Sequence, residues 1–284
     1  MKFDCIIIGN GPAGVTCGIY LKRFGHNVLI IGKDNGALEK AESIENVYAL
    51  GSMSGKDIIS SGIKQALNLG VSIAHDEVLG IEYAEEGYKV VATKMEYSAP
   101  YIVIATGKAR NSFQLAKKYE GLGVSYCATC DGFFYRNKPI ALVGYNDYMK
   151  HELEHLSNLT KDITIYTNGN KLQTNVGDFK VIEEKITALK GDQKFSGIIT
   201  ENTDNDYAGC FIALGSANAF SLAKHLGLEI DDKNNLVVDN LYMTNIDGIY
   251  AVGDVIGGVL QITKASYDGM MAAYAINNKL RGKK

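Results

Sequence analysis

The sequence lacks both long apolar runs and a strong excess of charge of either sign. No run approaches the roughly 20 apolar residues that a membrane-spanning helix needs, and the first residues lead into a strand without the pattern of a signal peptide. The formal net charge of −3 provides no broad basic field for nucleic acid or for an anionic membrane. We therefore expect a cytoplasmic protein whose partners include neither nucleic acid nor a membrane.

Composition gives no marker of a domain boundary, because the chain has no Pro-rich or Ser-rich linker, no low-complexity tract and no short-period repeat. Cysteine is scarce, with five in 284 residues. Cys5, Cys17 and Cys210 lie among apolar neighbours, where a free cysteine usually behaves as a small buried hydrophobe. Only Cys127 and Cys130 are spaced as a pair.

Strand and helix patterns of the same kind occur twice along the chain. Residues 3–32 read as a strand, a glycine turn, a helix and a second strand, which together have the length of a βαβ unit. Residues 78–107 alternate like antiparallel strands before a final buried strand. After Arg110 the βα pattern restarts with the strand PIALVGY, and two more buried strands and a helical stretch close the sequence.

This order of elements predicts an α/β protein with two Rossmann-like domains of three layers each. One domain is expected to be discontinuous, comprising residues 1–110 and 209–284. The other, residues 111–208, is expected to be inserted into it. A 284-residue chain is long enough for two such cores.

Gly9, Gly11 and Gly14 form the pattern G-x-G-x-x-G between a strand and a helix, which is the context that a dinucleotide-binding fingerprint requires. Gly9 permits the tight turn, Gly11 lets the backbone approach a pyrophosphate, and Gly14 allows close packing of the helix. Pro12 and Ala13 open the helix, whose N-terminus would face the phosphates. The alternative is a glycine-rich turn in some other α/β protein, and the acid expected to bind a ribose after the second strand is absent.

Cys127 and Cys130 lie three residues apart in SYCATCDG, directly before Asp131. A thiol pair at this spacing can close a small disulfide at a helix start, where the helix dipole favours the thiolate. Half of a zinc site is the alternative, but no second CxxC supplies the missing ligands. His151 and His155 share a helix face on which we expect solvated side chains. The pair therefore predicts a redox-active disulfide and no metal site.

Six segments resemble, in the same order, the low-molecular-weight thioredoxin reductases over nearly the whole chain. They are GNGPAG, SIENV, IATG, CATCDGFFYRN, GIYAVGDV and QITKASYDG. The resemblance implies FAD as the cofactor, thioredoxin as the protein substrate and a homodimer as the assembly. The residues that it assigns to FAD are Gly9, Gly11, Pro12, Ala13, Gly14, Ala105, Thr106, Gly107, Gly253, Asp254, Gln261 and Ile262.

The same resemblance implies roles for individual residues. Asp254 would hydrogen-bond the ribitol chain of FAD. Cys130 would face the flavin and receive its electrons, Cys127 would attack the disulfide of thioredoxin, and Asp131 would donate a proton. This chemistry is consistent, because thiol–disulfide exchange needs an attacking thiolate, a leaving thiol and a nearby acid.

The disulfide-bearing domain of this family ordinarily also holds NADPH, but the motifs for NADPH are missing here. The loop G-x-G-x-x-A is replaced by Gly144 to Met149. Within it, Asn146 adds a side chain where the backbone must approach pyrophosphate, and Asp147 adds a negative charge beside the expected anion. The family's His-Arg-Arg cluster for the 2′-phosphate is replaced by Tyr166-Thr167-Asn168. The alternative is a drifted loop that still binds NADPH.

Without NADPH motifs, the chain is similar to a pyridine-nucleotide-independent branch, the ferredoxin-dependent flavin thioredoxin reductases. That resemblance implies reduced ferredoxin as the electron donor, and ferredoxins are usually acidic, so we expect a local basic patch. Its candidate residues are Lys108, Arg110, Lys117, Lys118, Arg136 and Lys138. Three alternatives stay open: an NADPH-dependent enzyme, an enzyme with a second flavin in place of NADPH, and a non-catalytic flavin-bound redox sensor.

Overall fold

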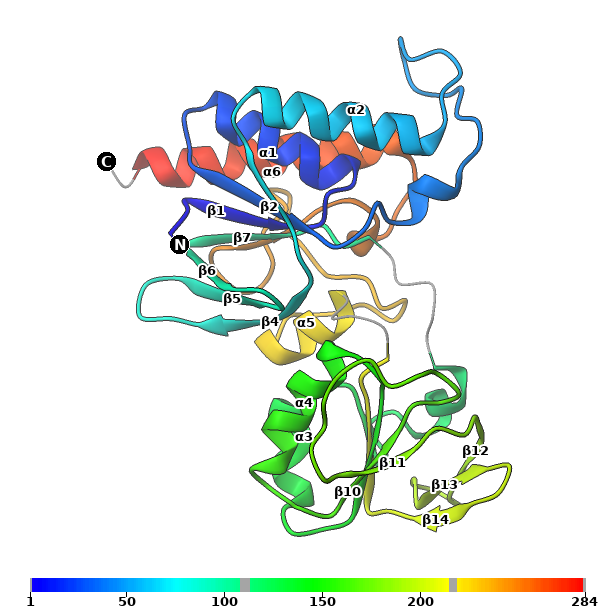
Figure 1. Cartoon of the computed structure of the whole chain (residues 1–284). Coiled ribbons are helices and arrows are strands. Elements are labelled where there is room, and N and C mark those ends of the chain that lie inside the picture. The colour runs from blue at the N-terminus through cyan, green and yellow to red at the C-terminus, as the bar shows by residue number, and fades with distance from the viewer. Residues whose placement is uncertain (1, 108–112, 215–218, 283–284) are drawn as a thin grey trace. The chain divides into compact units, whose positions relative to one another are not determined.

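The structure, a computed structural model, describes residues 2–107, 113–214 and 219–282 (Figure 1). The chain divides into two compact units, of which the first comprises Met1–Ala109 and Asn218–Lys284 and the second comprises Arg110–Ala217. Each unit contains a parallel sheet with helices, which confirms the predicted α/β fold class. No helix in the described ranges combines the length and the apolar composition of a membrane span.

The first unit is built on a parallel sheet in the strand order β16-β7-β1-β2-β3. All residues of β1 and β2 are buried, as expected for strands covered on both faces. Because β1 pairs with both β2 and β7, its C-terminal end is a topological switch point, where α/β sheets bind ligands. The strands are β1 (Cys5–Ile8), β2 (Val28–Gly32), β3 (Ser72–His75), β7 (Tyr101–Ile104) and β16 (Ile249–Ala251).

Three helices, α1, α2 and α6, cover one face of this sheet, and a three-stranded antiparallel sheet lies on its other side (Figure 1). The second sheet confirms the antiparallel pattern predicted from residue 78 onward. Its strands are β4 (Val78–Tyr83), β5 (Tyr88–Ala92) and β6 (Glu96–Ala99). The helices are α1 (Pro12–Arg23), η1 (Ala37–Lys40), α2 (Gly55–Asn68), α5 (Ala219–Leu226), η4 (Gly253–Ile256) and α6 (Ile262–Gly282).

The second unit repeats the parallel arrangement in the strand order β11-β10-β9-β15-β8, and a small antiparallel sheet of β12, β13 and β14 accompanies it. The parallel strands are β8 (Val124–Ser125), β9 (Ile140–Val143), β10 (Ile163–Tyr166), β11 (Lys180–Ile182) and β15 (Gly209–Ile212). The antiparallel strands are β12 (Ile186–Lys190), β13 (Gly197–Thr200) and β14 (Asp204–Asp206). The helices are η2 (Gln114–Tyr119), α3 (Ala128–Asp131), η3 (Gly132–Tyr135) and α4 (Asp147–Ser157).

Strand β15 belongs to the second unit, although the sequence analysis assigned it to the discontinuous domain. We expected residues from 209 onward to belong to the discontinuous domain, but β15 pairs in parallel with β9 and β8 of the second unit. The second unit accordingly extends to Ala217. The physical reason is that β15 is buried along its whole length, and such a strand fits the centre of either parallel sheet.

The three cysteines outside the CxxC pair are buried and form no disulfide, as expected. Cys5, Cys17 and Cys210 are each 0% exposed. Burial raises the pKa of each thiol above its ordinary value, which disfavours the reactive thiolate. These side chains therefore serve as small core residues.

Helices α1 and α6 approach so closely that Gly269 has no room for a side chain. A Cβ atom at Gly269 would lie 2.1 Å from the carbonyl oxygen of Ala13 and 3.1 Å from the backbone nitrogen of Cys17. Backbone atoms cannot move aside as the end of a flexible side chain can, so α6 itself would have to shift. This contact fixes the first turn of α1 against α6.

Gly269→Ala is expected to lower the free energy of unfolding by about 1–3 kcal/mol, which is the usual cost of over-packing a well-packed core. The matched control is Gly282→Ala at the end of the same helix, where a Cβ atom would meet nothing within 4 Å. The Gly282→Ala protein should be no less stable than the wild type, because alanine favours a helix more than glycine does. Urea unfolding followed by circular dichroism measures both variants, and equal midpoints would contradict the close contact.

Candidate active site

The glycine turn after β1 is a tight backbone contact with the end of β7. Gly9 has φ +118°, a conformation that favours glycine, and a Cβ atom there would lie 2.2 Å from the carbonyl oxygen of Ala105. A Cβ atom at Gly14 would lie 2.0 Å from the carbonyl oxygen of Gly9. Glycine is therefore required at both positions for the turn to close onto the helix.

The start of α1 is open and carries no negative charge of its own. Gly11 is the N-cap residue, no side chain caps the helix, and its first turn contains no acidic residue. A Cβ atom at Gly11 would meet nothing within 4 Å, so space is free beside the first residue of the helix start. The hydroxyl oxygen of Thr106, after β7, is buried and finds no hydrogen-bond partner among the described residues. An open helix N-terminus beside such a hydroxyl fits the phosphates of a dinucleotide.

An ion pair with a buried carboxylate holds the turn at Gly253 beside the open start of α1 and Thr106, which we call the phosphate cradle. Asp268 of α6 is 1% exposed, and its Oδ2 atom accepts a hydrogen bond from the backbone N–H of Gly253 at 3.1 Å. The Nζ atom of Lys264 lies 2.7 Å from the same carboxylate and donates to the carbonyl oxygens of Gly253 and Gly257 at 3.1 and 2.8 Å. Tyr242 donates its hydroxyl to Asp268 at 3.0 Å. Together these contacts fix the backbone that carries the partly exposed Asp254.

Burial and the hydrogen bond to Asp268 raise the pKa of Tyr242 to about 12, so its hydroxyl stays a donor at neutral pH. Sequence reasoning missed Lys264, Asp268 and Tyr242. The i, i+4 spacing of Lys264 and Asp268 on one helix was a signal for the ion pair. The contact of that pair with the Gly253 turn was not visible in the sequence.

The predicted FAD residues meet at one edge of the first unit's sheet. Gly9–Gly14, Ala105–Gly107 and Gly253–Asp254 follow β1, β7 and β16, which are neighbours in the sheet. Gln261 and Ile262 lie at the start of α6, and the Oε1 atom of Gln261 accepts a hydrogen bond from Asn46 at 2.8 Å. A Cβ atom at Gly253 would lie 2.9 Å from that of Ala13, which places the Gly253 turn against α1.

The CxxC pair forms a disulfide at the start of α3, as predicted. Cys127 is the N-cap residue, and its Sγ atom accepts a hydrogen bond from the backbone N–H of Cys130 at 3.1 Å. The two cysteines differ in exposure: Cys127 is only 1% exposed, whereas Cys130 lies exposed at the surface. An external reactant therefore reaches Cys130 far more easily than Cys127.

Asp131 is tied to the disulfide segment by a serine that sequence reasoning also missed. The buried hydroxyl of Ser125 donates to the Oδ2 atom of Asp131 at 2.7 Å and accepts from the backbone N–H of Cys127 at 3.1 Å. The backbone N–H of Asp131 donates to the carbonyl oxygen of Cys127 at 3.2 Å. These bonds orient a carboxyl group beside the cysteine pair.

The start of α4 contrasts with that of α1. Asn146 caps α4 by accepting a hydrogen bond from the backbone N–H of Met149 through Oδ1 at 3.3 Å, and Asp147 adds an acidic side chain to the first turn. A Cβ atom at Gly144 would lie 2.5 Å from both the carbonyl oxygen of Ala213 and the Cβ atom of Met149. The Asn146 cap and the Asp147 carboxylate therefore both disfavour an anion at the start of α4.

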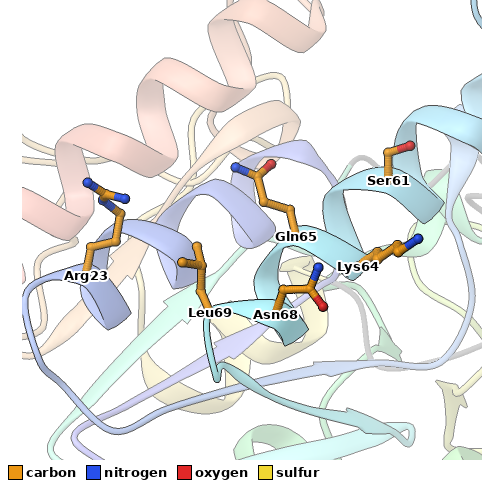
Figure 2. A pocket seen from close by; sticks show the side chains of 6 residues that line it. All are labelled: Arg23, Ser61, Lys64, Gln65, Asn68 and Leu69. Carbon is orange, nitrogen blue, oxygen red and sulfur yellow. The ribbon is translucent and has the colours of Figure 1, made fainter.

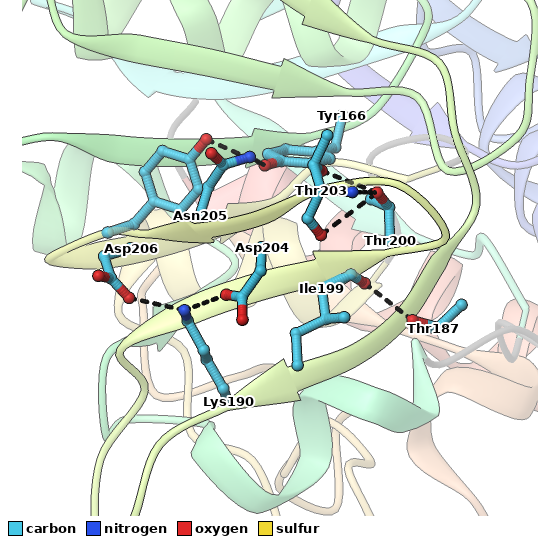
Figure 3. Close-up of polar contacts among 10 residues, drawn as sticks. Tyr166, Thr187, Lys190, Ile199, Thr200, Thr203, Asp204, Asn205 and Asp206 are labelled. Atoms are coloured by element: carbon cyan, nitrogen blue, oxygen red, sulfur yellow. Dashed lines mark hydrogen bonds and ion pairs between the residues drawn. The ribbon is translucent and has the colours of Figure 1, made fainter.

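The segment that replaces the family's basic cluster is also used internally. Tyr166 is fully buried, and its hydroxyl lies 3.0 Å from that of Tyr207 and accepts from Asn205 at 3.0 Å (Figure 3). Thr167 is buried, and the side-chain oxygen of Asn168 accepts a hydrogen bond from the backbone N–H of Ile186 at 3.0 Å. None of the three side chains is cationic, so this segment does not fit a 2′-phosphate.

Four of the six basic residues predicted for docking lie in the described part of the chain, and Lys108 and Arg110 lie outside it. Lys117 and Lys118 are exposed on η2. Arg136 lies over the ring of Phe133, with 5.3 Å to the ring centroid, and Lys138 donates to the carbonyl oxygen of Phe134 at 3.0 Å. Docking at these residues stays a prediction.

A surface depression of about 390 Å³ lies between the end of α1 and the outer face of α2 (Figure 2). It is lined by Arg23, Ser61, Lys64, Gln65, Asn68 and Leu69. None of these residues belongs to the predicted site, so the depression is not part of it.

The ion pair at the Gly253 turn yields a test of the cradle with FAD, the cofactor that the resemblance implies. Lys264→Met should weaken FAD binding about tenfold or more, because it removes charged hydrogen bonds worth about 1.5–3 kcal/mol each. The control is Lys279→Met on the same helix, where an exposed pair with Asp247 at 3.5 Å contributes little. Fluorescence titration of the apoprotein with FAD measures both affinities, and equal affinities would contradict the role of Lys264.

Comparisons with known proteins agree with this geometry. The thioredoxin reductases of Listeria monocytogenes and Aquifex aeolicus are 31% and 29% identical to the chain, over 95% and 99% of it and 91% and 94% of their own lengths. The solved structure of the atypical thioredoxin reductase TRi from Desulfovibrio vulgaris Hildenborough is similar with a TM-score of 0.92 at 30% identity, covering 98% of each chain. The solved structure of a ferredoxin-flavin thioredoxin reductase from Clostridium acetobutylicum is similar with a TM-score of 0.76 at 28% identity, covering 99% of each chain.

The sequence model of the pyridine nucleotide-disulphide oxidoreductase family matches residues 3–145 and 148–269, which is nearly the whole chain. The cradle in the first unit and the disulfide in the second are the two features that this chemistry needs. The chain therefore belongs to the pyridine nucleotide-disulphide oxidoreductases, within them to the low-molecular-weight thioredoxin reductase family, and FAD is its cofactor.

Proposed function

We propose that this protein passes electrons from reduced ferredoxin, through FAD and the Cys127–Cys130 disulfide, to thioredoxin. The observation that carries the proposal is the difference between the starts of two helices. Helix α1 begins open at Gly11, whereas α4 is capped by Asn146 and carries Asp147 in its first turn. The first unit can thus hold the phosphates of a dinucleotide, and the second unit opposes them.

The absence of a suitable phosphate site argues against NADPH as the donor. An anion at α4 would have to displace the Asn146 cap and approach the carboxylate of Asp147, and both changes cost free energy. The similarity to a ferredoxin-flavin thioredoxin reductase supports a one-electron donor in its place. FAD supplies the chemistry that accepts electrons and passes them on as a pair.

The transfer is favourable in energy. A ferredoxin at about −400 mV that reduces a disulfide at about −270 mV releases about 6 kcal/mol for two electrons. Reduction breaks the Cys127–Cys130 bond and takes up two protons, which gives two thiols. In the second half of the cycle one thiolate attacks the thioredoxin disulfide and the other thiol displaces it, so that the protein disulfide re-forms and thioredoxin leaves as the dithiol.

Exposure favours Cys130 for the exchange with thioredoxin, in contrast to the role that the resemblance gave to Cys127. The Cys127 sulfur is buried in the N-cap position, whereas Cys130 is exposed. Phe133 and Phe134, directly after α3, are 65% and 68% exposed and provide an apolar surface beside it. Asp131, held by Ser125, is placed to donate or accept the proton of the exchange.

The electron donor is identified by anaerobic rapid mixing of the FAD-loaded protein with reduced ferredoxin or with NADPH. Reduced ferredoxin should reduce the bound flavin and support turnover of thioredoxin. NADPH should be slower by about 100-fold or more, since lost phosphate contacts of about 3 kcal/mol correspond to that factor. Cys127→Ser/Cys130→Ser is the control that keeps flavin reduction and abolishes turnover. Rapid turnover with NADPH and none with ferredoxin would refute the proposal.

The exchanging sulfur is identified by trapping a mixed disulfide with a thioredoxin that lacks its resolving cysteine. The Cys127→Ser variant, which keeps the exposed Cys130, should form the mixed disulfide about tenfold faster than Cys130→Ser, because access governs exchange. Non-reducing gel electrophoresis follows both reactions. Faster trapping by Cys130→Ser would restore the attacking role to Cys127.

A further inference from the structure

We propose that Glu152 of α4 is a positioning residue that anchors the start of the disulfide helix and keeps the Cys127 sulfur buried, so that exchange passes through Cys130. The purpose of this device rests on the proposed function, because it matters only if the disulfide exchanges with a partner protein. The device itself rests on contacts within the second unit.

The anchoring contact joins two helices. Glu152 lies midway along α4 and is 2% exposed, and its Oε2 atom accepts a hydrogen bond from the backbone N–H of Ala128 at 2.8 Å. Ala128 is the first residue of α3, directly after Cys127. A carboxyl group at such depth is costly unless it is hydrogen-bonded, so this bond is a specific feature of the core.

The other hydrogen bonds described at the start of α3 are local. The N–H of Cys127 donates to Ser125, that of Cys130 donates to the Cys127 sulfur, and that of Asp131 donates to the Cys127 carbonyl oxygen. Of the bonds described for the backbone amides of residues 127–131, only the one from Ala128 reaches beyond residues 125–131. Glu152 therefore connects the disulfide segment to the rest of the fold.

The end of the segment also rests on the same part of the chain. A Cβ atom at Gly132 would lie 2.8 Å from the Cδ1 atom of Leu159 and 3.3 Å from the Cδ2 atom of Leu156. Helix α3 is thus held by Glu152 at its start and by close packing with the end of α4 and the residues after it. This explains why α4 is useful although its own N-terminus is closed to phosphate.

Loss of the anchor should expose Cys127. Helix α3 has four residues, which is too few for a stable helix without tertiary contacts. When its first N–H loses the partner on α4, the remaining hydrogen bonds described for the backbone amides of residues 127–131 are local. The Cys127 sulfur, now 1% exposed, then becomes accessible from outside.

The test measures which cysteine reacts in the reduced, FAD-loaded protein. Brief alkylation with iodoacetamide is followed by mass spectrometry of the peptides that carry Cys127 and Cys130, and the result is the ratio of Cys127 to Cys130 labelling. Glu152→Met should raise this ratio about tenfold, because it leaves a buried N–H unpaired at a cost of about 1–3 kcal/mol. Glu152→Gln keeps an acceptor oxygen and should restore the ratio to within about twofold of wild type.

Two further variants complete the series. Glu152→Asp keeps the charge but withdraws the acceptor by one methylene, so it should raise the ratio as Glu152→Met does. Glu154→Gln, an exposed position on the same helix, is the matched control and should leave the ratio unchanged. If Glu152→Met does not fold, as judged by circular dichroism and FAD content, Glu152→Asp decides the question.

The proposal is overturned if the folded Glu152→Met or Glu152→Asp protein has the wild-type ratio. It is also overturned if Glu152→Gln behaves like Glu152→Met, because the charge and not the hydrogen bond would then be responsible. Alkylation needs neither ferredoxin nor thioredoxin. A failure here is therefore distinguishable from a failure of the proposed function, which the donor assay reveals.

Discussion

The start of a helix leaves backbone N–H groups without intrahelical partners, and the chemistry of this protein depends on what meets those groups at three helices. At α1 no side chain caps them and space is free beside Gly11, which suits the phosphates of FAD. At α3 they are taken by Ser125, Glu152 and the Cys127 sulfur. At α4 the side chain of the N-cap residue Asn146 accepts a hydrogen bond from one of these N–H groups. One structural motif thus serves to bind a cofactor, to shape a disulfide and to close a surface.

The two units show how one fold supports different tasks. In both, a buried parallel strand leads through a glycine into a helix. The residues after that glycine differ, because space is free beside Gly11 at α1, whereas Asn146 caps α4 and Asp147 adds a negative charge that disfavours an anion. The second unit nevertheless keeps its α4 helix, and the contacts of α4 with the disulfide segment give a physical reason for that retention.

Much of the fold followed from local patterns. The G-x-G-x-x-G turn, the antiparallel strands from residue 78 and the CxxC disulfide each depend on a few neighbouring residues, so the sequence was sufficient. Other features depend on contacts between distant segments. The pairing of β15 with β9, the ion pair of Lys264 and Asp268 at the Gly253 turn, and the bond from Ala128 to Glu152 join residues that no local period connects. The unequal exposure of Cys127 and Cys130 likewise arises from packing.

The burial of every cysteine except Cys130 bears on how the protein withstands oxidants. Peroxides attack thiolates at accessible sites, and Cys5, Cys17 and Cys210 offer neither exposure nor a favoured thiolate. An oxidant therefore reacts first with Cys130, and Cys127 is near enough to form the Cys127–Cys130 disulfide with it. A peroxide would convert the Cys130 thiolate to a sulfenic acid, which condenses with the Cys127 thiol, releases water and gives the same disulfide that turnover forms, so that a supply of electrons is enough to repair it.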